Sequence, residues 1–297
     1  MSSTRMLCVL WVFTVLSLSC AREGSHSELG GAKSQRIVSL APSITEILFA
    51  VGAGERLVGV TTYCNYPPAA TRITKIGGLV NIDIEKIIAL KPDIVIGTKD
   101  GNPIEVFNRL RKLGIRVETF QPATFRETCE SIVELGRLTG KEQEACALCA
   151  EMEKKLKEIT ASRPKRSPGI LLLYGFDPLV VAGEGSIGDE LIRLAGGRNV
   201  MEGSPGPYLR PDIENIITKN PEVILELSMG TEKDSAGIAQ KRWSRWRSVS
   251  AVRNEQIYVL DPDLITRPGP RILEGLALIA QAIRKAAEIP PASEEGK

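Results

Sequence analysis

Histidine, cysteine and tyrosine side chains are the first places to look for chemistry in this chain. Its only histidine, His26, stands in a polar stretch of serine, glycine and glutamate near the start. A Ser-His-Asp site, a two-histidine zinc site and a histidine proton shuttle would each have to use that one residue. Because such a stretch lies outside any plausible core, we expect no histidine-based catalysis.

The cysteines beyond residue 20 offer a second kind of site. They are Cys64, Cys129, Cys146 and Cys149. The spacing Cys146-x-x-Cys149 is that of half a zinc site, but it stands in a charged helical pattern without a second pair of this kind. We therefore expect buried thiols or one structural disulfide and no metal, and the sequence does not fix which cysteines pair.

Tyrosines occur in loops that follow predicted strands. Tyr63 begins the segment Tyr-Cys-Asn-Tyr-Pro-Pro, Tyr208 ends Ser-Pro-Gly-Pro-Tyr, and Asp263 ends Asp-Pro-Asp. Loops beyond the carboxyl ends of strands are the usual ligand positions of α/β sheets. No G-x-G-x-x-G follows the first strand, and neither a P-loop nor a G-x-S-x-G motif occurs. These patterns favour a binding site without catalytic residues or cofactor over an enzyme.

The composition is that of a globular protein with nearly balanced charge. The 297 residues include 38 lysines and arginines and 36 aspartates and glutamates, a net charge of +2. Hydrophobic residues make up 43% and charged residues 25%, which argues against a disordered chain. Nucleic-acid-binding proteins usually carry a strong basic excess, so we expect no nucleic-acid partner.

The start of the chain has the pattern of an export signal. Residues 6–18 are almost wholly apolar, and this run is shorter than the ~20 residues that a spanning helix needs. It resembles a bacterial lipoprotein signal, in which Cys20 would become the lipidated first residue, although Ser17 stands where that pattern prefers leucine. We expect a signal peptide over residues 1–20, a flexible linker over 21–34, and a periplasmic or cell-surface protein held at the membrane only by that lipid.

Strands and helices alternate along the rest of the chain. Ser43-x-x-Glu46 is a capping-box signature and predicts the start of the first amphipathic helix. Strands are predicted at residues 35–40, 57–61, 93–97, 115–120, 169–174, 223–227 and 257–260, and further helices at 84–90, 104–113, 189–194, 213–218 and 272–287. Such alternation predicts a parallel sheet covered by helices.

The two halves of the chain are similar to each other. Asp83-Ile-Glu-Lys-Ile-Ile and Asp212-Ile-Glu-Asn-Ile-Ile are each followed by a proline and a strand at the same spacing. Between the halves, residues 141–163 lack glycine and proline and place apolar side chains three or four residues apart, which predicts a long amphipathic helix. We predict an α/β fold of two Rossmann-like lobes joined by this one backbone helix, with a ligand cleft between the lobes. The predicted boundaries are 35–140 for the first lobe, 141–163 for the helix, 164–289 for the second lobe and 290–297 for a polar tail.

Several segments resemble the helical-backbone (class III) family of periplasmic binding proteins. The resemblance covers residues 35–287 and rests on Arg36-Ile-Val-Ser-Leu-Ala-Pro-Ser-Ile-Thr-Glu, on Ile84-Glu-Lys-Ile-Ile-Ala-Leu-Lys-Pro-Asp and on Thr266-Arg-Pro-Gly-Pro-Arg. The last of these and the Tyr-Pro-Pro segment are most similar to the cobalamin-binding branch. The resemblance implies a monomeric substrate-binding protein of an ABC importer, which captures a corrinoid and delivers it to a permease and its ATPase.

The resemblance also implies two docking residues. Glu85 and Glu214 occupy matched positions in the two repeated blocks. In the family such a carboxylate on each lobe docks on basic residues of the transporter. A two-fold symmetric partner would require the same charge twice.

The ligand contacts implied by the resemblance lie on both lobes. Tyr63 and Tyr208 would face the corrinoid, one from each lobe. Leu79 stands where the cobalamin branch carries a tryptophan, so one large face is missing. Asp263 and Arg267 would form a polar pair near the ligand.

Three other interpretations remain open. A ferric siderophore or haem binder has the same fold, and Arg210, Arg267 and Arg271 could surround an anionic complex. A nitrogenase-like metal-cluster enzyme would need cysteines at matched strand ends, a spacing that these cysteines do not show. A purely structural lipoprotein would have no ligand site.

Overall fold

The computed structural model describes residues 35–228 and 235–290. By its internal contacts the chain divides into two units, Met1–Lys33 and Ser34–Lys297, and every described residue belongs to the second. The predicted signal peptide, the lipid site Cys20 and the linker therefore lie outside the described residues. Within the described part, no helix is both long enough and apolar enough to cross a membrane.

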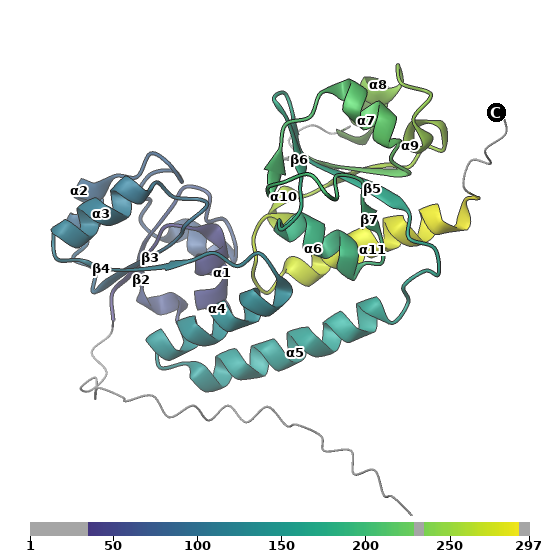
Figure 1. The fold of residues 1–297 in the computed structure, drawn as a ribbon. Coiled ribbons are helices and arrows are strands. Elements are labelled where there is room, and N and C mark those ends of the chain that lie inside the picture. Colours follow the sequence, from purple (N-terminus) through teal and green to yellow (C-terminus); the bar gives the residue numbers. More distant parts are fainter. Residues whose placement is uncertain (1–34, 229–234, 291–297) are drawn as a thin grey trace, which may run out of the picture. The chain divides into compact units, whose positions relative to one another are not determined.

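The first lobe is built on a parallel sheet of four strands in the order β2-β1-β3-β4 (Figure 1). The strands are β1 (Ile37–Ser39), β2 (Leu57–Val60), β3 (Ile94–Thr98) and β4 (Arg116–Phe120). Every residue of β3 is buried, as expected for a parallel sheet with both faces covered. The helices of this lobe are α1 (Pro42–Ala50), α2 (Ile84–Ala89) and α3 (Ile104–Lys112), with the 3-10 turns η1 (Gly54–Arg56) and η2 (Pro68–Arg72).

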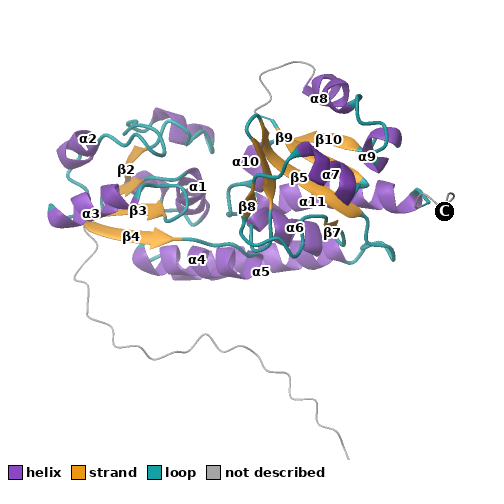
Figure 2. Ribbon diagram, turned by 45° about the horizontal axis from the view of Figure 1, so that its top comes forward, coloured by secondary structure: helices purple, strands orange, loops and turns teal. Residues whose placement is uncertain are grey.

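Two helices, α4 (Phe125–Leu138) and α5 (Glu142–Thr160), connect the lobes and lie side by side (Figures 1 and 2). Helix α5 was predicted from the spacing of its apolar residues, whereas α4 was not predicted. A capping box starts α4, since Thr124 Oγ1 accepts from the Glu127 amide at 3.1 Å and the Glu127 carboxylate accepts from the Thr124 amide at 3.2 Å. The helices pack closely, because a Cβ added at Gly136 would lie 2.5 Å from the Cβ of Ala145.

The second lobe contains a mixed sheet in the order β10-β9-β5-β6-β8, with β7 paired to β5 (Figure 2). The predicted strands form the parallel part of it, and β6 and β8 add antiparallel pairs that the sequence analysis did not predict. The strands are β5 (Gly169–Phe176), β6 (Leu179–Ala182), β7 (Arg198–Asn199), β8 (Tyr208–Leu209), β9 (Val223–Leu227) and β10 (Ile257–Leu260). The helices are α6 (Ile187–Leu194), α7 (Ile213–Lys219), α8 (Ser235–Trp243), α9 (Ser250–Arg253), α10 (Pro262–Ile265) and α11 (Ile272–Glu288).

One hydrophobic core cluster reaches from the first lobe to the second. It includes Ile47 of α1, Leu135 of α4, Met152 of α5 and Leu276 of α11, each of them buried. Helix α11 packs against both α5 and α6. Because apolar side chains of both lobes share one core, a large opening of the lobes would expose hydrophobic surface to water.

The repeated blocks form matching helix starts, whereas the predicted capping box at Ser43 is wrong. Asp83 Oδ1 accepts from the Lys86 amide at 3.0 Å at the start of α2, and Asp212 caps α7 in the same way at 2.7 Å. The hydrogen bond from the Lys86 amide holds the pKa of Asp83 below its ordinary value. By contrast, α1 starts after Ala41 with Pro42 in its first turn and no side-chain cap, so Ser43 lies inside the helix.

Candidate ligand-binding site

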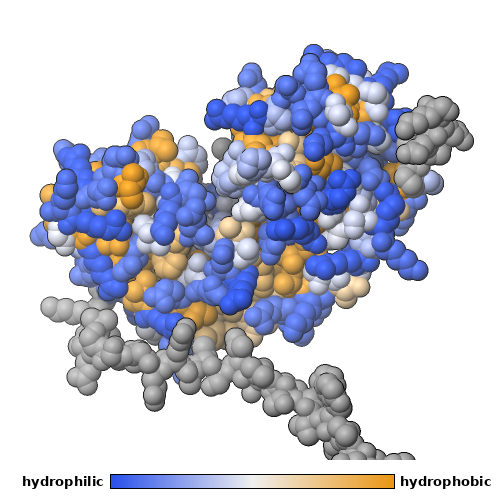
Figure 3. Space-filling view, in the orientation of Figure 1, coloured by the Kyte–Doolittle hydropathy of each residue, from blue (hydrophilic) through white to orange (hydrophobic). Residues whose placement is uncertain are grey.

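A hollow of about 380 Å³ lies between the two lobes. Its size falls within the ~300–1,000 Å³ typical of small-molecule sites. The space-filling view shows the surface indented between the lobes (Figure 3). The first lobe contributes Ala41, Pro42, Ser43, Tyr63, Leu79, Thr98, Asp100, Gly101 and Pro122, and the second contributes Tyr174, Tyr208, Leu227, Pro262, Asp263, Thr266, Arg267 and Pro268.

Exposed aromatic rings line the hollow from both lobes. Tyr63 keeps 46% of its surface exposed and Tyr208 keeps 51%. Tyr174 of β5 supports Tyr208 edge-on, with ring centroids 5.2 Å apart and an interplanar angle of 63°. Large exposed aromatic side chains at a concave surface are a common feature of ligand sites. The site therefore offers ring faces to a broad apolar ligand.

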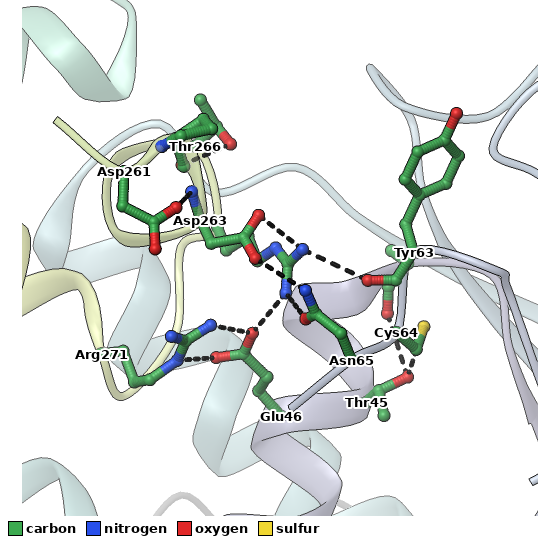
Figure 4. A network of polar contacts seen from close by, with 12 residues as sticks. Thr45, Glu46, Tyr63, Cys64, Asn65, Asp261, Asp263, Thr266 and Arg271 are labelled. Carbon is green, nitrogen blue, oxygen red and sulfur yellow. Dashed lines mark hydrogen bonds and ion pairs between the residues drawn. The ribbon is translucent and has the colours of Figure 1, made fainter. Parts of the chain in front are cut away.

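Arg267 is held by four groups at one end of the hollow. Its Nη1 donates to Glu46 Oε1 at 3.0 Å and to Asn65 Oδ1 at 2.7 Å. Its Nη2 donates to the Tyr63 carbonyl at 3.2 Å and lies 2.5 Å from Asp263 Oδ1. The other oxygen of Asp263 accepts from Asn65 at 3.0 Å. Figure 4 shows the carbonyl of Tyr63 in this network and its ring pointing away from it.

Arg271 binds the same carboxylate from a second direction. Its Nε donates to Glu46 Oε2 at 2.8 Å and its Nη2 donates to Glu46 Oε1 at 2.7 Å (Figure 4). The guanidinium also lies over the ring of Tyr66, 4.1 Å from the centroid. These hydrogen bonds raise the pKa of Arg271 above its ordinary value. Glu46 thus joins α1 of the first lobe to two arginines of the second.

The charge of the hollow follows from this network. Among its lining residues Arg267 is the one cation, and the described carboxylates are Asp100 and Asp263. Both terminal nitrogens of Arg267 are engaged, Nη1 by two hydrogen bonds and Nη2 by one hydrogen bond and one ion pair, so little remains for an anionic ligand. Asp100 is exposed at the rim. The described lining is therefore apolar and slightly acidic rather than basic.

A smaller hollow of about 150 Å³ continues from the first and shares Asp100, Tyr174 and Tyr208 with it. The buried hydroxyl of Tyr174 has no hydrogen-bond partner among the described residues. Glycine is required at position 188, because a Cβ there would lie 2.7 Å from this hydroxyl. Burial raises the pKa of Tyr174, and burial together with the Asp100 carboxylate raises the pKa of Tyr208. Both rings therefore stay neutral at physiological pH.

Glu85 and Glu214 lie in the first turns of α2 and α7, two residues after the capping aspartates. Both side chains are exposed, and neither carboxylate forms an ion pair with another described residue. In Figure 1, α2 and α7 lie on the sides of their lobes that face away from α5. The structure therefore presents one carboxylate from each lobe at corresponding positions.

The chain is similar to known binding proteins over most of its length. A model of the periplasmic binding protein family matches residues 37–264. The chain belongs to this family. It is 32% identical over 257 residues to YvrC, an ABC transporter substrate-binding lipoprotein of Bacillus subtilis, covering 84% of this chain and 80% of that protein.

Two solved structures of binding proteins share the fold of the chain. The crystal structure of the periplasmic vitamin B12 binding protein BtuF of Vibrio cholerae has a TM-score of 0.76 and 31% identity, with 86% of this chain and 98% of that chain covered. The apo form of the periplasmic heme-binding protein RhuT from Roseiflexus sp. RS-1 has a TM-score of 0.76 and 30% identity, with 86% of this chain and 100% of that chain covered. The predicted two-lobe fold of class III binding proteins is thereby confirmed.

The structure gathers the predicted ligand residues of this binding protein around one hollow. They are Tyr63, Leu79, Tyr208, Asp263 and Arg267. Arg210 and Arg271, named above for an anionic ligand, do not line it. Whether the five residues contact a ligand stays a prediction.

Sequence reasoning missed the roles of Glu46, Asn65 and Tyr174. The Glu46 carboxylate was assigned to a capping box, although it meets two arginines more than two hundred residues later in the chain. The position of Glu46 among apolar residues of an amphipathic helix was a signal, because a carboxylate that is buried there needs a partner of opposite charge. No pattern in the sequence identifies that partner.

No metal centre occurs among the described residues, since no group of three histidine, cysteine, aspartate or glutamate side chains is placed to hold one. The four described cysteines are free thiols. Cys64 is buried beside the hydroxyls of Thr45 and Thr61, both at 3.2 Å. It does not line the ligand hollow.

Proposed function

We propose that this chain is the substrate-binding protein of an ABC importer and captures a corrinoid such as cobalamin between its two lobes. The observation that carries the ligand assignment is the pairing of Arg267 and Arg271 with Glu46, which leaves an apolar, tyrosine-lined hollow without a free guanidinium. A corrin ring is broad and apolar over its faces and carries amides at its edge. Tyr63 and Tyr208 would cover the faces, and the polar loop groups would meet the amides.

A ferric siderophore is the weaker candidate on the same physical ground. An anionic iron complex needs cations that can leave their partners at small cost. Removing Arg267 from Glu46 and Asp263 would leave buried charges without partners, and such a loss costs several kcal/mol. The rim residue Asp100 would further repel an anion.

Haem is the second candidate, and the 30% identity to a heme-binding protein favours it. The exposed phenol of Tyr63 is also a chemically suitable ligand for haem iron. The propionates of haem would, however, face the same shortage of free cations. We therefore rank a corrinoid first.

The proposed activity is binding and delivery, in which no bond of the ligand changes. The described hollow contains tyrosines and a paired ion cluster rather than a nucleophile with an adjacent base. Export to the periplasm agrees with the family. The lipid anchor at Cys20, a monomeric state, and docking of Glu85 and Glu214 on a permease coupled to its ATPase are further parts of this proposal. The similarity to an ABC transporter substrate-binding lipoprotein supports the anchor and the partner.

Isothermal titration calorimetry with cyanocobalamin, haemin and a ferric catecholate tests the ligand assignment. We expect saturable heat at one equivalent of cyanocobalamin and weaker or no heat with the two anionic ligands. The double variant Tyr63→Ala/Tyr208→Ala should lose that heat while its circular dichroism spectrum stays unchanged. Saturable heat with the ferric catecholate alone would overturn the choice of a corrinoid.

A further inference from the structure

Two of the described cysteines meet at the interface of α4 and α5. Cys129 of α4 and Cys149 of α5 are 9% and 7% exposed and belong to the same core cluster. The Sγ of Cys149 lies 3.4 Å from the carbonyl oxygen of Cys129. The two cysteines are therefore in contact, although they stand twenty residues apart in the chain.

The packing of the two helices keeps the thiols together. Residues 139–141 form a tight connection, in which the Lys141 amide donates to the Gly136 carbonyl at 2.7 Å. Gly136 lets the backbone of α4 approach Ala145 closely. Side chains on facing turns of such closely packed helices can approach to the ~3.5–4.5 Å between Cβ atoms that a disulfide requires.

We propose that Cys129 and Cys149 form a disulfide bond in the exported protein and thereby cross-link α4 to α5, the two helices that connect the lobes. This proposal depends on the proposed function only for its compartment, since oxidising compartments outside the cytoplasm allow such bonds to persist. It gives the cysteine pairing that the sequence left open.

The bond forms by exchange with a disulfide of a thiol oxidoreductase, which is the oxidant. The Cys129 thiolate attacks one sulfur of that disulfide, and the other sulfur leaves as a thiolate. The Cys149 thiolate then attacks the Cys129 sulfur and releases the second oxidoreductase thiol. Two electrons and two protons pass from the cysteines to the oxidoreductase.

Both thiols are buried in the folded chain. The exchange with the oxidoreductase therefore takes place before α4 and α5 have closed on each other.

The other described cysteines are less suited to this bond. Cys64 lies in the first lobe, where its sulfur is 3.2 Å from the hydroxyls of both Thr45 and Thr61. Cys146 is on the same helix as Cys149, three residues earlier, and is partly exposed. We expect Cys64 and Cys146 to remain thiols.

Cysteine labelling of the full chain, secreted with its own signal into an oxidising periplasm, tests the proposal. The denatured protein is alkylated before and after reduction, and peptides are mapped by mass spectrometry. We expect two more alkylated cysteines after reduction, and a linked peptide that contains Cys129 and Cys149. Cys149→Ser should abolish the difference, and the matched control Cys146→Ser should retain it. Equal labelling, or a linked peptide that contains Cys146, would overturn the proposal.

Thermal unfolding gives a second measurement, in which the wild-type chain is compared with and without a reductant and no variant has to fold. A reductant should lower the Tm of the secreted wild-type chain by about 6–12 °C, because the bond closes a twenty-residue loop in the unfolded state. The same reductant should leave the Tm of Cys129→Ala/Cys149→Ala unchanged. An unchanged wild-type Tm would contradict the cross-link. Cyanocobalamin binding is measured separately on the same sample, so that a failure of the proposed function is distinguished from a failure of the cross-link.

Discussion

Arg271 donates two hydrogen bonds, of 2.8 and 2.7 Å, to the carboxylate of Glu46, a residue 225 positions earlier in the chain. Glu46 lies in α1 of the first lobe, and Arg271 immediately precedes α11 of the second. Arg267 adds a third hydrogen bond to the same carboxylate at 3.0 Å. The side chain of Glu46 is 3% exposed. This buried cluster joins the lobes and occupies hydrogen-bond donors of two guanidinium groups.

Removing the Glu46 carboxylate should destabilise the chain strongly. Glu46→Ala leaves Arg267 and Arg271 without their shared partner, and breaking a buried pair in this way costs ~3–5 kcal/mol. Urea denaturation followed by circular dichroism measures the free energy of unfolding. The control Glu130→Ala breaks an exposed pair with Arg126 and should change the free energy of unfolding by less than ~1 kcal/mol. Equal losses in the two variants would contradict a special role for Glu46.

A milder change at the same residue should alter ligand preference. Glu46→Gln keeps the shape of the side chain but removes the charge that neutralises Arg267 and Arg271. We expect the variant to bind a ferric catecholate at least ~10-fold more tightly than the wild type does, because an anion can then replace the missing carboxylate. Calorimetry with both proteins measures this ratio. No gain in catecholate affinity would mean that the guanidinium groups stay out of reach of a ligand.

Leu79 lines the hollow at a position where a larger ring would cover more of a flat ligand. Leu79→Trp should increase the affinity for cyanocobalamin by ~3- to 10-fold, since an added aromatic contact contributes about 0.5–1.5 kcal/mol. The matched control is Leu113→Trp, at an exposed position after α3 that does not line the hollow. It should leave the affinity unchanged. Similar affinities of both variants would place the ligand away from Leu79.

The sequence was sufficient to predict the parts of the fold that depend on local patterns. Buried apolar runs marked β3 and β9, and a partly buried one marked β10. The paired aspartates marked the starts of α2 and α7, because a cap and the apolar spacing lie within a few residues. The antiparallel strands β6 and β8 were missed. They are short, at four and two residues, and pairing with β5 rather than their own pattern makes them strands.

The ligand site was predictable only in part, for a similar physical reason. Tyr63 could be recognised because loops after strands carry ligand residues in α/β folds. Tyr208 was expected in such a loop as well, but it lies in the short strand β8, where it pairs with Ala182 of β6. The role of Glu46 depends on two arginines that only the folded chain brings to it. The local pattern predicted that Glu46 belongs to a capping box, but in the folded chain its carboxylate is buried and bonds to Arg267 and Arg271 instead.

The hydroxyl of Tyr174 should make the stability of the chain fall at alkaline pH. Burial raises its pKa in the folded state, above the value of about 10 in an unfolded chain. The folded state therefore retains this proton more strongly, and its contribution to the free energy of unfolding is present below pH ~10 and is lost as the pH rises above that value.

Unfolding by urea at pH values on both sides of this range measures the effect. Relative to Tyr174→Phe, the wild type should lose up to ~1.4 kcal/mol of unfolding free energy per pH unit above pH ~10. Tyr63→Phe, which changes an exposed ring and leaves Tyr174 intact, should lose stability as the wild type does. Parallel pH profiles of the wild type and Tyr174→Phe would contradict the assignment.

Reversing the charge of Glu85 and Glu214 should separate transport from binding. Glu85→Lys/Glu214→Lys should abolish uptake of labelled cobalamin by cells that depend on this protein, because the two new positive charges would then repel basic residues of the permease. The affinity for cyanocobalamin should remain unchanged, since neither residue lines the hollow. The control Glu130→Lys/Glu158→Lys makes the same charge change on α4 and α5 and should support normal uptake. Normal uptake by the first double variant would exclude the docking role.

A crystal structure of the chain grown with cyanocobalamin tests the central claim most directly. The account predicts an intact corrin ring between the rings of Tyr63 and Tyr208, with Arg267 and Arg271 still bonded to Glu46. A corrinoid bound outside the hollow, or Arg267 released from Glu46 to contact the ligand, would contradict it.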